Sequence, residues 1–179
     1  MIRRLVDALT MLCGWGLVAF SLGVGVEIVG RRYLGFSLQG VDEVGGYLMA
    51  VAVAAGFSCA LYDRAHIRID LLLGHVPGRL AMCLNVLALV GLFVFAVFLA
   101  SRGLLVLTES YQLEAVSSTP LLTPMVVPQS IWVGSLVLFA IVSLSCAVRA
   151  LRHALRGEAE AVESLIGTSS ARPPARDNA

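Results

Sequence analysis

The chain has 179 residues, of which 58% are hydrophobic and 14% are charged, and its formal net charge is +1. A soluble domain carries about 25% charged residues, so this composition excludes an ordinary soluble enzyme and predicts a membrane protein. We expect membrane lipids among its partners and no nucleic acid.

Four long uncharged segments fill most of the chain, at 8–26, 44–62, 80–101 and 115–148. A helix needs about 20 apolar residues to cross a hydrocarbon core of roughly 30 Å. Each of the first three segments is long enough, and prolines in the first half of the fourth leave 129–148 for its helix. The sequence therefore predicts an all-α integral membrane protein with four transmembrane helices and short loops. We expect spans at about 5–29, 43–62, 80–102 and 127–148 in a membrane domain at 1–156, followed by a polar, disordered cytoplasmic tail at 157–179.

The arginines predict how the helices are oriented. All 13 basic residues are arginine. With four spans, both termini and the connection between spans two and three lie on one side, which holds ten arginines, whereas the other side holds three. The positive-inside rule then places both termini in the cytoplasm. The first apolar segment is longer than the core of a signal peptide and has no A-x-A site before Arg31, so we expect it to remain as a helix.

Acidic and basic residues gather around the first connection. Glu27 lies near the outer end of span one, and Arg31 follows one helical turn later, which predicts an interfacial ion pair. Asp42 and Glu43 begin span two, where Asp42 is expected to cap the helix and both carboxylates complement its positive end. The second carboxylate is then free to face Arg31 and Arg32 across the loop, or to meet a partner.

Small residues recur at every fourth position along span two, at Gly46, Ala50, Ala54 and Ser58. Such a stripe lets two helix backbones approach closely in lipid. We expect it to be a contact surface for another helix. That helix is either part of another protein or span one or three of the same chain.

The connection between spans two and three has an amphipathic pattern. If it is helical, His66 and Asp70 form a pair four residues apart, and Arg64 and Arg68 form a second polar column. This pattern predicts a helical turn that lies in the membrane interface, with its arginines toward the lipid headgroups.

Residues that carry chemistry are few in the predicted spans. Arg102 is expected to close span three, and no histidine, arginine or acid is expected at mid-membrane depth. We therefore expect no catalytic residue, cofactor or metal site, since the three histidines are scattered along the chain. A four-helix redox protein would need paired histidines within spans. A free-standing homo-oligomeric transporter remains an alternative, with Glu27 as its ion-coupling carboxylate.

Several motifs follow one another along the chain: Asp42-Glu43 at the start of span two, Gly56 within it, Arg64-x-His66-Ile67-x-x-Asp70 after it, and Ser118-Thr-Pro120…Pro124…Pro128 before the last span. Their order resembles the small membrane subunit of tripartite ATP-independent periplasmic (TRAP) transporters, the DctQ family. The resemblance covers about 3–152. One departure is Gly40, because the family often carries a tryptophan a few residues before the position of Glu43.

The resemblance implies a non-catalytic small permease subunit in the bacterial inner membrane. Such a subunit works with a large multi-span membrane subunit that imports organic acids, driven by an ion gradient. A periplasmic substrate-binding protein delivers the substrate. The small subunit enlarges the scaffold of the large one and helps the binding protein to dock.

Overall fold

The computed structural model describes residues 2–36, 40–62 and 78–157, and it confirms an all-α fold with four long helices. All four are long and apolar enough to cross a membrane. The expected amphipathic turn and the expected disordered tail lie outside the described residues, apart from Gly157 at the start of the tail. The helices are α1 (Ile2–Val29), which continues into a π-helical turn, η1 (Gly30–Leu34), then α2 (Val41–Tyr62), α4 (Gly78–Gln112) and α5 (Val126–Leu155).

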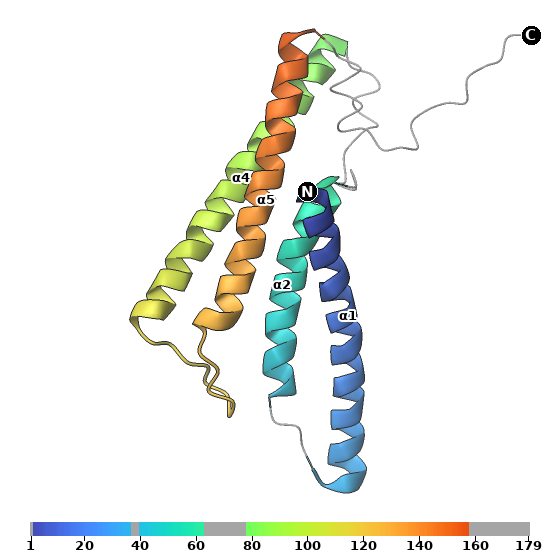
Figure 1. Ribbon diagram of the computed structural model, residues 1–179, viewed down its shortest axis with the longest axis vertical. Helices are drawn as coiled ribbons and strands as arrows, with labels where there is room; N and C mark the ends of the chain where they lie inside the picture. Colours follow the sequence, from blue (N-terminus) through green and yellow to red (C-terminus); the bar gives the residue numbers. More distant parts are fainter. Residues whose placement is uncertain (1, 37–39, 63–77, 158–179) are drawn as a thin grey trace, which may run out of the picture.

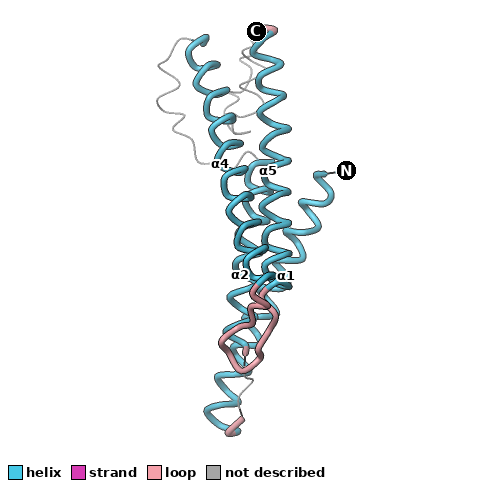
Figure 2. The backbone as a smooth tube through the Cα atoms, turned by 90° about the vertical axis from the view of Figure 1, so that its left-hand side faces the viewer, coloured by secondary structure: helices cyan, strands magenta, loops and turns pink. Residues whose placement is uncertain are grey.

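The helices form an open row in the order α4, α5, α2, α1 (Figure 1). α5 packs against both α4 and α2, and α1 packs against α2. Seen from the side, the helices largely overlap, so the row is a single layer (Figure 2). A row leaves two faces of each helix uncovered. On α1, for example, Met11 and Trp15 are each 65% exposed, which suits a surface that lies in hydrocarbon.

The third long helix continues past Arg102, the expected end of its membrane span, as far as Gln112. Leucine and valine fill positions 104–107, shortly after Arg102, which favours continuation of a helix in lipid, and one charge does not break its hydrogen bonding. The hydroxyl of Thr108 also donates to the carbonyl oxygen of Leu105, at 2.8 Å, within this last part of the helix. Arg102 is therefore an internal residue of α4.

Proline shapes the start of α5. The helix begins at Val126, and Pro128 lies in its first turn, where a backbone N–H has no helical partner and its loss costs nothing. The prolines before it, at 120 and 124, belong to the loop between α4 and α5.

Glycine allows α1 and α2 to pack closely. Gly45 of α2 is buried, and a Cβ atom at this position would lie 2.1 Å from Cζ of Phe20 on α1. The neighbouring Gly46 is exposed, and a Cβ atom there would meet nothing within 4 Å. Of the two adjacent glycines, Gly45 therefore lies against the Phe20 side chain of α1, whereas Gly46 does not.

We expect Gly45→Val to weaken the contact between α1 and α2, because the added side chain must displace the ring of Phe20. Overpacking of this kind costs about 1–3 kcal/mol. Thermal unfolding of the detergent-purified protein measures the effect. Gly46→Val is the matched control and should leave the melting temperature unchanged or slightly higher; an equal loss in both variants would contradict the packing described here.

Candidate subunit interface

The first candidate feature is a polar junction between the start of α2 and the loop that precedes α5. The hydroxyl of Tyr47 donates a hydrogen bond to Oε1 of Glu43, at 2.7 Å, and the hydroxyl of Thr119 donates to Oε2. Oγ of Ser117 lies 2.9 Å from Oγ1 of Thr119. The Tyr47 hydroxyl also approaches Sδ of Met125, at 3.4 Å. One carboxylate thus joins two segments far apart in the sequence, at the end where both loops lie (Figure 1).

The α4–α5 loop presents Thr119 because it folds back on itself. The backbone N–H of Ser117 donates to the carbonyl oxygen of Thr123, at 2.9 Å, and that of Met125 donates to the carbonyl oxygen of Ala115, also at 2.9 Å. At the tip of the loop, the backbone N–H of Leu122 donates a hydrogen bond to the carbonyl oxygen of Thr119, at 3.0 Å. These bonds form a short hairpin-like turn between the two helices.

Gly40 lies directly against this turn. Its φ is +94°, a left-handed conformation that favours glycine. A Cβ atom at this position would lie 1.5 Å from Cδ1 of Leu121. Gly40 therefore satisfies both a backbone and a space requirement, and the tryptophan common in the family would not fit at this position.

Gly40 also takes the cap position that the sequence predicted for Asp42. Its carbonyl oxygen accepts the first helical hydrogen bond, from the N–H of Val44 at 3.1 Å, and α2 begins at Val41. The prediction was wrong because a glycine with positive φ turned the chain into the helix two residues earlier. Asp42 is exposed in the first turn, where its charge still complements the helix dipole.

The predicted ion pair at the end of α1 is confirmed. Nε and Nη2 of Arg31 lie 3.1 and 2.5 Å from Oε1 of Glu27, whose side chain is largely buried. Arg32 is exposed in the π-helical turn. Glu43 bonds to the α4–α5 loop rather than facing these arginines.

The small-residue stripe on α2 is divided between two environments. Ala54 and Ser58 are buried, and Ala54 packs in a cluster with Ala100 of α4 and Leu136 of α5. Gly46 and Ala50 are exposed. Helices of the same chain thus cover the inner part of the stripe, including α5, which the sequence had not suggested. The outer part is uncovered.

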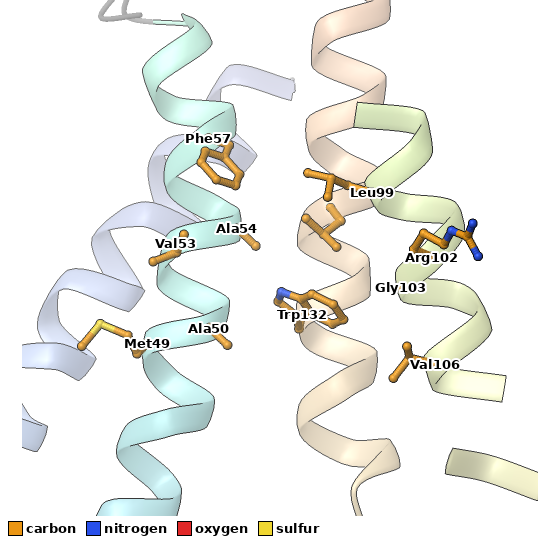
Figure 3. A pocket seen from close by; sticks show the side chains of 11 residues that line it. Met49, Ala50, Val53, Ala54, Phe57, Leu99, Arg102, Gly103, Val106 and Trp132 are labelled. Atoms are coloured by element: carbon orange, nitrogen blue, oxygen red, sulfur yellow. The ribbon is translucent and has the colours of Figure 1, made fainter. Parts of the chain in front are cut away.

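The uncovered part opens into the second candidate feature, an apolar groove of about 390 Å³ between α2, α4 and α5 (Figure 3). α2 and α5 run in the same direction (Figure 1). Ala50 and Phe57 of α2 and Trp132 of α5 line the groove, and the ring centroids of Phe57 and Phe139 lie 5.5 Å apart, with the rings tilted by 41°. Gly103 belongs to the opposite wall, where α4 contacts α5. The small side chains keep the groove open.

Arg102 lies on the edge of this groove. Its guanidinium carbon is 5.3 Å from the ring centroid of Phe98, a cation–π contact. The α2 residues that line the groove lie between Met49 and Phe57, in the middle of that helix.

Two expected site residues, His66 and Asp70, lie outside the described residues. Within 2–36, 40–62 and 78–157, no group of three or more histidine, cysteine, aspartate or glutamate side chains is arranged to hold a metal ion. Sequence reasoning missed Thr119 and Ser117 as partners of Glu43. The one available signal was the Ser-Ser-Thr segment in a loop otherwise rich in proline and leucine.

Comparison with known proteins gives one family. Residues 20–153 match the family described as "Tripartite ATP-independent periplasmic transporters, DctQ component". The match covers most of the membrane helices and includes the junction and the groove, and it confirms the resemblance seen in the sequence. No curated protein and no solved structure matches significantly.

We expect Glu43→Ala to loosen the junction, because the hydroxyls of Tyr47 and Thr119 both lose their acceptor. The variant should unfold at a lower temperature than the unmodified chain, and Thr119→Val in the same background should add little further loss. Asp42→Ala removes an adjacent, exposed carboxylate and is the control. Equal destabilisation by both substitutions would show that only the charge at the helix end matters.

We expect Gly40→Ala to destabilise the protein more than Gly35→Ala. Both glycines have positive φ, but a Cβ atom at Gly35 would meet nothing within 4 Å. The strain common to both is about 1–2 kcal/mol, and the excess at Gly40 measures the clash with Leu121. Adding Leu121→Ala should remove that excess in thermal unfolding; no recovery in the double variant would contradict the contact.

Proposed function

The chain belongs to the DctQ family, the small permease component of tripartite ATP-independent periplasmic transporters, and we propose that it is a non-catalytic scaffold for the large membrane subunit of such an importer. The observation that carries the proposal is the open row of helices with its apolar groove. A packing subunit needs an apolar surface with small residues, where the backbone of a partner helix comes close. The exposed Ala50 offers such a surface.

We also propose the orientation and the compartment. The family supports a bacterial inner membrane, and the arginine distribution supports cytoplasmic termini. In that orientation, the junction at Glu43 lies on the periplasmic side. It joins the start of α2 to the α4–α5 loop, which gives a surface suited to help a substrate-binding protein dock.

The proposed cargo is an organic acid, imported with an ion gradient as its energy source. This part of the proposal rests on the family and not on a site in the chain. The groove is almost entirely apolar in its lining, which does not suit a carboxylate substrate. The pairing of Glu27 with Arg31 supports a structural role for that carboxylate rather than ion coupling. The substrate path then belongs to the large subunit.

Purification of the tagged chain from its native host in mild detergent, followed by mass spectrometry, tests the proposal. We expect one much larger multi-span protein of the transporter in about equal amount. Recovery of the chain alone, as a defined homo-oligomer, would overturn the scaffold role and direct attention to Glu27→Gln in an uptake assay.

We expect Ala50→Phe to reduce recovery of the large subunit, because the ring fills the groove that its helix would occupy. Ala54 is unsuitable for this test, since it is buried within the chain itself. Ala19→Phe, at an exposed position of α1, is the matched control and should preserve the complex. Unchanged recovery with Ala50→Phe would show that the groove is not the interface.

A further inference from the structure

We propose that the end of α5 binds an anionic phospholipid, whose phosphate lies against a stripe of exposed arginines and whose acyl chains lie against apolar residues beside them. The arginines are Arg149, Arg152 and Arg156. They lie at the end of α5 opposite the Glu43 junction, which is the cytoplasmic side in the proposed orientation. Binding of this lipid is separate from the scaffold role and requires only that α5 spans a membrane.

The arginines begin where α5 leaves the hydrocarbon. α5 is uncharged from its start to Val148, and Arg149 is its first charged residue. Leu61, one residue before the end of α2, packs against the cluster that contains Ala147 and Ala150. Two uncharged helices therefore end at the same level. Arginine side chains at such a helix end reach the membrane interface, where the lipid phosphates lie.

Beyond this level, α5 runs beside α4, because the described parts of α1 and α2 do not extend that far (Figure 1). Ala147 and Ala150 are buried in a cluster with Leu89 of α4. All three arginines are exposed. The side of α5 that carries them is therefore not covered by α4.

Helix geometry places the arginines on one face and an apolar stripe next to them. Residues three and four positions apart are neighbours on a helix surface. Arg152 accordingly has Arg149 and Arg156 on one side and Val148 and Leu155 on the other. Val148 is 37% exposed and Leu155 is 81% exposed. A basic stripe beside an apolar one matches an amphiphile with an anionic head.

The charge of this face calls for an anion. Within the described residues, ion pairs are present at Arg3–Asp7 and at Arg31–Glu27, and neither involves the end of α5. Like charges at neighbouring positions of a helix repel one another. The helix dipole favours a positive charge only in the last turn, so it does not account for Arg149. A phosphate accepts paired hydrogen bonds from guanidinium groups, and in a phospholipid it is joined to chains that the apolar stripe can contact.

Native mass spectrometry of the full chain in mild detergent tests the site. It compares the binding of phosphatidylglycerol, which is anionic, with that of phosphatidylcholine, which has no net charge. We expect Arg149→Gln combined with Arg152→Gln to lower the affinity for phosphatidylglycerol by about tenfold and to leave that for phosphatidylcholine unchanged. An unchanged affinity for phosphatidylglycerol would overturn the inference.

Arg3→Gln combined with Arg4→Gln is the matched control, because it removes two exposed arginines from the start of α1. It should keep the preference for phosphatidylglycerol. An equal loss in both double variants would show a general attraction between charges and overturn the site on α5. Excess inorganic phosphate should leave phosphatidylglycerol bound; displacement of the lipid would show a site for free anions instead.

A second measurement decides the matter if the arginine variants fail to accumulate. A photoreactive residue in place of Leu155, in an otherwise unmodified chain, should cross-link to phospholipid in cells. Cross-linking to the large subunit alone, or to residues 158–179 of the chain alone, would overturn the inference. The proposed function is tested separately, by recovery of the large subunit, so the failure of one is distinguishable from the failure of the other.

Discussion

The packing of α2 against α5 is the contact on which the arrangement of the whole molecule depends. α1 packs on α2 and α4 packs on α5, so each outer helix is held through an inner one. The two inner helices run in the same direction, and they meet where Ala54 packs with Leu136 and where the tilted rings of Phe57 and Phe139 lie close together. Without this contact the chain would be two separate helical hairpins.

Apolar packing along the helices and polar contacts at one end both hold the two hairpins together. Along the helices, burial gives little drive for association because lipid is as apolar as the helix surfaces, and close packing of small residues contributes instead. At one end, the carboxylate of Glu43 binds hydroxyls from α2 and from the α4–α5 loop. Gly40 lets that loop lie against the start of α2. The junction thereby fixes how the two hairpins meet.

An open row of helices leaves more helix surface uncovered for other proteins than a closed four-helix bundle does. In a closed bundle each helix buries a face against two or more neighbours, whereas here α1 and α4 are edges and both sides of the row are uncovered. The groove with Arg102 on its rim is the least ordinary part of that surface. It combines small residues with a charged side chain, and a surface that contacts only lipid would not need this combination. The family assignment and this surface both support the proposed role of a subunit that a larger one covers.

The sequence by itself determined the class of protein, the number of helices and the family. Long uncharged segments are read directly from composition, since hydrocarbon accepts only helices without free backbone groups. It also determined the Glu27–Arg31 pair, because residues four apart on one helix are neighbours whatever the fold. The tertiary structure alone decided which loop meets Glu43, why residue 40 is a glycine, and that α5 covers Ala54. It also placed Arg102 opposite the middle of α2. These depend on how far one hairpin is shifted along the other, and no local pattern in a chain of apolar helices encodes that shift.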